Sequence, residues 1–157
     1  MSISLNLVIY QREDDELIEE GLRTARCAEI AASLLNAIRE KFPSLKCRVY
    51  YDSAKEEFFE IEYFARSDIP KVISMLQGLF EDLIEYEYSL RNFGASKKCE
   101  RLKKSDLILS DILSDQEALD PTLIAIGRFR NLISVFDAFS EMQTKFIDEP
   151  GAVLKLG

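Results

Sequence analysis

The chain has 157 residues, of which 47% are hydrophobic and 31% charged, values typical of one soluble domain with its own core and too apolar for a disordered chain. Acidic residues outnumber basic ones by 28 to 20, and the net charge of −8 argues against a general affinity for nucleic acid or an anionic membrane. Histidine is absent, which excludes Ser-His-Asp and Cys-His catalysis and every histidine metal site.

The three cysteines, Cys27, Cys47 and Cys99, are too widely spaced for a zinc site or a Cys-x-x-Cys redox motif. We expect Cys27 and Cys47 to be buried free thiols, and Cys99 to be an oxidation-sensitive residue in a lysine-rich segment. The N-terminal residues lack the positive start of a signal peptide, and no apolar run approaches the roughly 18 residues of a membrane span. These features predict a cytoplasmic protein in a reducing compartment.

The beginning of the chain predicts a strand followed by a long helix. Residues 2–10 place apolar side chains at every second position, which is the period of a half-buried strand. The acidic run at 12–16 suits the positive end of a helix dipole. From Ile18 to Phe42 apolar residues recur at steps of three and four, so we predict one amphipathic helix of about seven to eight turns that ends at Pro43.

A β-hairpin and a second helix are expected next. Residues 46–52 and 57–64 are rich in Val, Tyr, Phe and Ile around a polar stretch, which is a hairpin signal. Pro70 fits the first turn of a helix that carries a continuous apolar stripe up to Gly94. The core face of the second hairpin strand is expected to hold three residues, Phe59, Ile61 and Tyr63.

The remainder of the chain predicts a basic linker and three further elements. Residues 95–104 carry a local charge of +4 and indicate an exposed linker, which a short helix over 105–114 follows. Asp120 and Pro121 suit the start of a last long helix. Residues 152–156 indicate a final strand, which we place beside the first one.

Together these elements predict a single α+β domain over residues 1–157, in the order β-α-β-β-α-α-α-β. A small antiparallel or mixed sheet packs against long helices in this prediction. The basic linker at about 95–104 joins an N-terminal βαββα part to a C-terminal helical part.

Motifs that carry chemistry are scarce. Carboxylates one turn apart, such as Glu81, Asp82 and Glu85, fit a solvated helix face, and the chain has neither a calcium-binding loop nor a glycine-rich phosphate loop. The basic segment 97–104 has no interleaved aromatic residue for base stacking. The sequence therefore predicts no catalytic residue, no metal site, no cofactor and no direct contact with nucleic acid.

The strongest functional signal is the pairing of carboxylates with aromatic residues, on the outward face of the hairpin and near the end of the second helix. Aromatic anchors among carboxylates suit a basic protein surface, because charge steers the encounter and buried rings supply affinity. The alternative for the hairpin is that another helix covers Phe58 and Phe64. The candidate partner-binding residues are Tyr50, Phe58, Glu60, Glu62, Phe64, Asp82, Glu85 and Glu87.

We therefore expect a small acidic binding protein that neutralises or regulates a basic protein partner, as immunity proteins, antitoxins and phage-encoded inhibitors do. Such a protein needs no cofactor and is not an enzyme. Two alternatives stay open. One is a structural or assembly subunit, either a homodimer or a component of a larger complex. The other is a small enzyme or ligand-binding domain that uses carboxylates and tyrosines.

Overall fold

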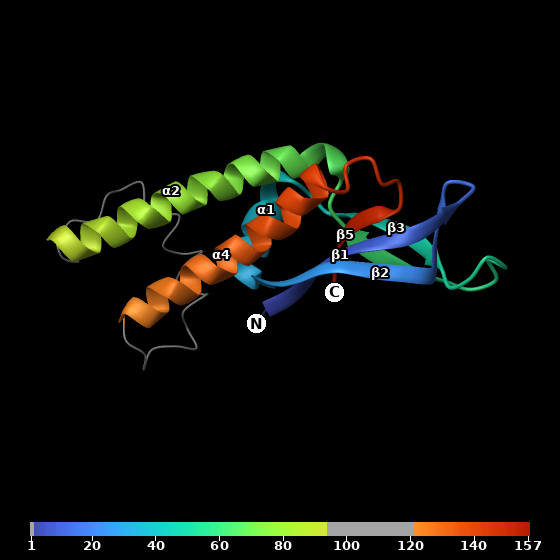
Figure 1. The fold of residues 1–157 in the computed structure, drawn as a ribbon, viewed down its shortest axis with the longest axis horizontal. Coiled ribbons are helices and arrows are strands. Elements are labelled where there is room, and N and C mark those ends of the chain that lie inside the picture. The colour runs from blue at the N-terminus through green and yellow to red at the C-terminus, as the bar shows by residue number, and fades with distance from the viewer. Residues whose placement is uncertain (1, 94–120) are drawn as a thin grey trace.

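The computed structural model describes residues 2–93 and 121–157 of the chain, which form a β-barrel and three α-helices (Figure 1). The elements in chain order are β1 (Ser2–Glu13), β2 (Glu16–Ala31), α1 (Ala32–Lys41), β3 (Leu45–Tyr50), β4 (Phe58–Tyr63), a 3-10 turn (Arg66–Asp68), α2 (Ile69–Phe93), α4 (Pro121–Thr144) and β5 (Ala152–Leu156).

The five strands close into a barrel in the order β1-β2-β3-β4-β5, and β5 returns to pair with β1. Neighbouring strands are antiparallel except β2 and β3, which pair in parallel with Leu17 opposite Val49 and Ile18 opposite Tyr50. The α+β class and the pairing of the last strand with the first are confirmed. The predicted element order is wrong, because two strands precede the first helix.

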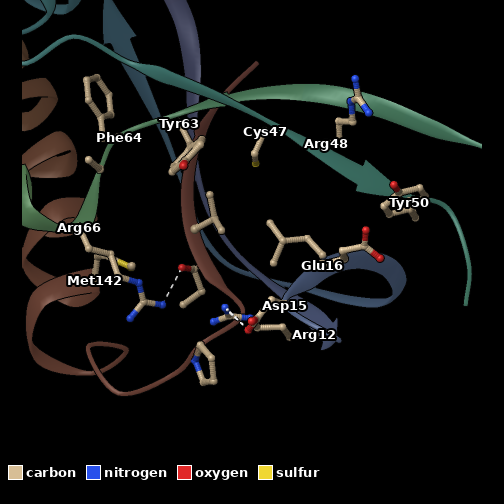
Figure 2. Close-up of a pocket in the computed structure, with 15 residues that line it drawn as sticks. Arg12, Asp15, Glu16, Cys47, Arg48, Tyr50, Tyr63, Phe64, Arg66 and Met142 are labelled. Atoms are coloured by element: carbon tan, nitrogen blue, oxygen red, sulfur yellow. Dashed lines mark hydrogen bonds and ion pairs between the residues drawn. The ribbon is translucent and has the colours of Figure 1, made fainter. Parts of the chain in front are cut away.

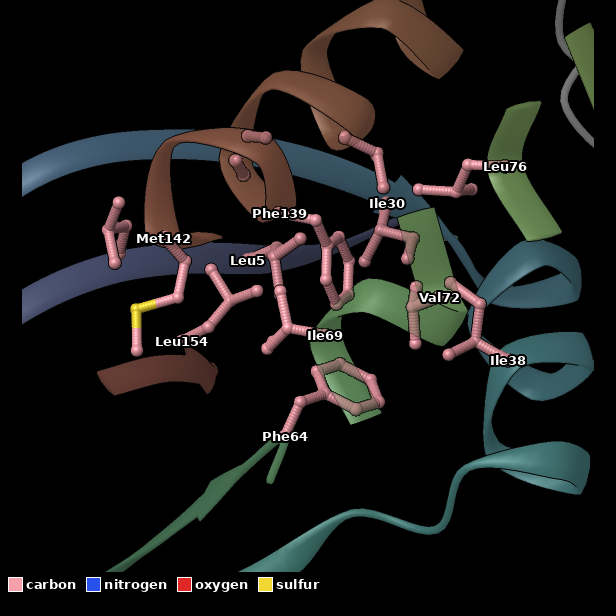
Figure 3. Close-up of a cluster of buried hydrophobic side chains, with 14 of the residues drawn as sticks. Leu5, Ile30, Ile38, Phe64, Ile69, Val72, Leu76, Phe139, Met142 and Leu154 are labelled. Carbon is pink, nitrogen blue, oxygen red and sulfur yellow. The ribbon is translucent and has the colours of Figure 1, made fainter. Parts of the chain in front are cut away.

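Two apolar clusters lie on opposite sides of the barrel wall. The first lies between the barrel and the helices and includes Leu5 of β1, Leu76 of α2 and Phe139 of α4 (Figure 3). Side chains alternate between the two faces of a strand, so the second cluster occupies the barrel interior; it contains Val8, Tyr10, Val49, Ile61 and Val153. Phe59 and Tyr63 pack against this second cluster, which confirms the expected core face of β4.

The predicted helix over residues 18–42 is wrong for most of its length. Glu16–Ala31 is strand β2, and helix α1 covers only Ala32–Lys41. The ladder between β1 and β2 contains two register shifts, after Leu7 and after Ile9. Extra residues at such shifts break the period of two along a strand, and the apolar spacing that results imitates a helix.

The two described cysteines differ in exposure. Cys47 is half-buried, but Cys27 is exposed on β2, so the expectation of a buried thiol at Cys27 is wrong. The physical reason is that β3 pairs with β2 only near its start, at residues 17–18, so no described strand lies on that side of the later part of β2.

Helices α2 and α4 lie side by side, run in opposite directions and project from the barrel (Figure 1). The rings of Phe80 and Phe136 meet edge to face between them, with centroids 5.7 Å apart. Both helices were expected from the sequence, whereas the predicted linker at 95–104 and helix at 105–114 lie outside the described residues. Over the described ranges, neither helix offers an apolar stretch long enough to cross a membrane.

Candidate functional site

The exposed aromatic centre of the predicted site is Phe58, at the start of β4. Its side chain is 48% exposed. The Tyr50 ring approaches it at 6.0 Å between centroids, and the guanidinium carbon of Arg48 lies 4.7 Å from its ring centroid. Tyr50 and Phe58 are cross-strand neighbours, and Arg48 lies two residues before Tyr50 on the same outward face, opposite Glu60. The hairpin therefore presents a partly exposed aromatic pair bordered by charge.

Glu62 has a different environment from Glu60, although both face outward on β4. Glu60 is exposed, whereas Glu62 accepts hydrogen bonds from the Ser44 hydroxyl and from the guanidinium of Arg39 on α1. These interactions, the Ser44 hydrogen bond first, lower the pKa of the Glu62 carboxyl below its ordinary value. Glu62 thus connects the hairpin to α1, and a partner would have to compete with this contact.

Phe64 does not belong to the exposed face. It is 2% exposed, and its ring lies 5.4 Å from the Phe139 ring between the barrel and α4. The Phe64 backbone N–H donates to the carbonyl oxygen of Leu154, so the chain continues along β5 and directs this side chain into the core. Its assignment to a partner-binding surface is wrong, and the alternative, in which a helix covers it, holds for Phe64 but not for Phe58.

The remaining candidates, Asp82, Glu85 and Glu87, lie on the C-terminal half of α2. This half projects from the barrel on the side away from the β3–β4 turn (Figure 1). Glu85 is exposed, and Asp82 and Glu87 are half-buried. The structure therefore does not bring the two predicted groups of carboxylates into one surface.

A second acidic segment contacts the hairpin: the run at 12–16, which was expected to begin a helix, forms a turn instead. Asp14 and Asp15 form the two-residue turn between β1 and β2, with φ angles of 50° and 68°. Lys55 in the β3–β4 turn places its Nζ 2.7 Å from Glu16 and 3.5 Å from Asp14. The Ser53 hydroxyl donates to Glu13 at 3.0 Å. The two turns therefore contact each other at the end of the barrel farthest from α2 and α4 (Figure 1).

We call this end of the barrel, residues 12–16 and 51–58, the acidic pole. It contains seven carboxylates against two cations, Arg12 and Lys55, a net charge of −5 out of −8 for the whole chain. Tyr51 is 49% exposed there, and its ring lies 4.9 Å from the Phe59 ring between centroids. A hydrogen bond to Glu16 raises the pKa of Lys55, so this lysine stays protonated between the two turns.

The turn itself carries the signal that could have revealed the acidic pole. A two-residue hairpin turn in which both residues have positive φ is of type I′, and Asp and Asn tolerate that conformation better than most residues. Asp14 and Asp15 follow the strand predicted at residues 2–10, so they are compatible with a turn as well as with the start of a helix.

No group of three or more Cys, Asp or Glu side chains is arranged to hold a metal ion among the residues that the structure describes. Comparisons with protein-family models, with curated proteins and with solved structures find no match to this chain. Its function must therefore be argued from its own residues.

Proposed function

We propose that this chain is a binding protein that recognises a basic surface of another protein through the acidic pole. The observation that supports this proposal is the contact between the β1–β2 and β3–β4 turns. It concentrates a charge of −5 around two aromatic side chains, Tyr51 and Phe58, that are each about half exposed. Charge of one sign steers a basic partner, and exposed rings supply the apolar area that a stable complex buries.

Inhibitors, immunity proteins and antitoxins that act on basic proteins fit this description, because they require shape and charge but no cofactor. The proposal keeps the hairpin part of the predicted interface, adds the β1–β2 turn to it and leaves out the α2 carboxylates. Tyr50, Phe58 and Glu60 remain within or beside this surface, and Glu62 lies at its border.

The test compares two double variants that remove the same charge. Asp14→Asn with Asp15→Gly places Asn-Gly in a type I′ turn, the sequence that this turn favours most, so the barrel stays folded while the acidic pole loses two carboxylates. Glu81→Gln with Glu85→Gln removes two exposed carboxylates from α2 and serves as the matched control.

Proteins that the wild-type chain retains from a lysate of its source organism are identified by quantitative mass spectrometry, and the affinity of the purified partner is then measured for all three chains. We expect a basic partner whose binding weakens about tenfold in the turn variant, roughly 1.4 kcal/mol, and hardly changes in the α2 variant. Equal binding by the turn variant and the wild type contradicts the proposal.

The projecting helices support a second candidate, an assembly subunit. Ile84 and Tyr88 on α2 are 58% and 62% exposed, and Ile133 on α4 is 46% exposed. Exposed apolar side chains on a helix pair suit contact with another helical surface. Light scattering over a range of protein concentrations tests this candidate, and a mass of one chain at every concentration excludes the homodimer.

A further inference from the structure

A pocket of about 520 Å³ opens at the mouth of the barrel, next to the acidic pole (Figure 2). It lies between β3 and β4 on one side and the β1–β2 turn and the segment before β5 on the other. Its apolar wall comes from the barrel interior and the end of α4, with Leu17, Val153 and Met142. Pockets of roughly 300–1,000 Å³ with mostly apolar walls and a few convergent polar groups are typical of small-molecule sites.

Two guanidinium groups, those of Arg12 and Arg66, lie along the same side of this pocket (Figure 2). Arg66 is held by the backbone: it donates to the carbonyl oxygens of Ile147 at 2.6 Å, Glu149, and Ala152 at 2.9 Å. Within the part of the chain that the structure describes, no carboxylate forms an ion pair with Arg66. Its position is therefore fixed, but its charge is not neutralised.

The two carboxylates that line the pocket, Asp15 and Glu16, each pair with a cation other than Arg66. Arg12 pairs with Asp15 at 2.7 Å, but the Asp15 side chain is 91% exposed, and pairs in water contribute little. Glu16 also lines the pocket, and Lys55 pairs with it at 2.7 Å. Arg48 borders the pocket with its charged end turned away from it (Figure 2).

The opposite side of the pocket offers neutral polar groups. Tyr63 and Cys47 lie there, facing Arg12 and Arg66 across the pocket (Figure 2). Burial raises the pKa of the Tyr63 hydroxyl and of the Cys47 thiol, so both groups keep their protons near neutral pH and can donate to an anionic ligand.

We propose that this pocket binds a small organic anion, a carboxylate or phosphate monoester with an apolar body. The anionic group would meet Arg12 and Arg66, because guanidinium groups match the geometry of carboxylate and phosphate oxygens. The apolar body would contact Leu17, Val153 and Met142. The pocket shares Arg12, Asp15 and Glu16 with the acidic pole, but its test needs no partner and uses the purified chain alone.

Melting temperature is measured first, with four probes at constant ionic strength set by NaCl: benzoate, phenyl phosphate, inorganic phosphate and the uncharged benzamide. We expect benzoate or phenyl phosphate to raise the melting temperature by about 3–5 °C at ten times its Kd, and benzamide not to. No shift with either organic anion overturns the proposal. An equal shift with inorganic phosphate overturns the role of the apolar wall.

Two arginine variants then locate the anion. Arg12→Gln removes a guanidinium that faces the pocket, and Arg48→Gln removes one that borders the pocket but turns away. We expect the ligand-induced shift to disappear in Arg12→Gln and to persist in Arg48→Gln. If both variants lose the ligand-induced shift in melting temperature equally, the anion interacts with the overall positive charge of this region and not with Arg12 in the pocket, and the proposal fails.

Alkylation of the wild-type thiols gives a readout that needs no variant. Iodoacetamide labelling is followed peptide by peptide, with the exposed Cys27 as an internal control outside the pocket. At ten times its Kd the anion slows the labelling of Cys47 on the order of tenfold and leaves that of Cys27 unchanged. Unchanged labelling of Cys47, or equal slowing at both cysteines, contradicts binding in this pocket.

Discussion

At the residue scale, Gly151, just before β5, is constrained by the close approach of the Tyr10 backbone. A Cβ atom added there would lie 1.9 Å from the carbonyl oxygen of Tyr10, and the Tyr10 N–H donates to the Gly151 carbonyl oxygen at 2.9 Å. Gly151→Ala must displace backbone, so we expect its free energy of unfolding to fall by about 3 kcal/mol. Gly78→Ala is the control, because nothing lies within 4 Å of its Cβ position in α2. Alanine favours a helix more than glycine does, so the free energy of unfolding of this variant should rise by about 0.5–1 kcal/mol. Urea denaturation measures both, and similar stability of the two variants would contradict the close approach.

Tyr10 gives the second prediction at this scale. Its side chain is 2% exposed, its hydroxyl has no hydrogen-bond partner among the described residues, and burial, more than the nearby Glu19 or Cys47, raises its pKa to about 12. Because a buried hydroxyl without a partner costs about 1–3 kcal/mol, we expect Tyr10→Phe to raise the free energy of unfolding by about 1 kcal/mol. Tyr51→Phe removes an exposed hydroxyl and should change stability very little. A loss of stability in Tyr10→Phe would show that the hydroxyl is hydrogen-bonded in solution.

At the scale of the elements, Glu141 on α4 connects that helix to β2. Its carboxylate accepts two hydrogen bonds from Arg26, at 2.9 and 3.0 Å, and one from Lys145 at 2.8 Å. The Arg26 hydrogen bonds are the main reason that the pKa of Glu141 falls to about 2. A carboxyl whose pKa is lower in the folded state stabilises the fold above its unfolded pKa of about 4.5, and this contribution disappears as the pH falls toward 2.

We therefore expect Glu141→Gln to unfold more easily than the wild type near neutral pH, by about 1–2 kcal/mol. The difference should shrink as the pH falls from about 4.5 to about 2. Asp137→Asn removes the carboxylate that lies farther from Arg26, at 3.7 Å, and should cost less. Urea denaturation at several pH values measures the free energy of unfolding of each variant. A difference between Glu141→Gln and the wild type that stays constant with pH would contradict the lowered pKa of Glu141.

The sequence predicted those elements whose signals are local. The period of two in β1, the apolar stripes of α2 and α4, and the end of α1 before Pro43 each depend on residues close together in the chain. Strand β2 could not be predicted in this way, because the register shifts that disturb its pattern exist only against β1. The exposure of Phe58 and the burial of Phe64 likewise depend on the position of α4, which covers Phe64 just after β4 and leaves Phe58 open.

At the scale of the whole molecule, the acidic pole follows from one pairing. Parallel contact of Leu17 with Val49 sets the start of β2 beside the end of β3, and so brings two turns about 40 residues apart to the same end of the barrel. No local pattern carries that information, which is why the sequence predicted the acidic and aromatic chemistry of the site but not its place.

Concentrated charge at the acidic pole also predicts how salt acts on the chain alone. Carboxylates of two turns are held together in the folded chain and separate when it unfolds, so screening their repulsion should stabilise the fold. From about 50 to about 500 mM NaCl we expect the free energy of unfolding to rise by up to about 1 kcal/mol, and by less in the Asp14→Asn, Asp15→Gly variant. Salt acts in the opposite direction on the proposed complex, whose attraction it screens. Urea denaturation of both chains at the two salt concentrations measures this effect. If salt lowers the free energy of unfolding equally in both chains, attraction within ion pairs such as Lys55–Glu16 outweighs the repulsion between the carboxylates, which contradicts the prediction.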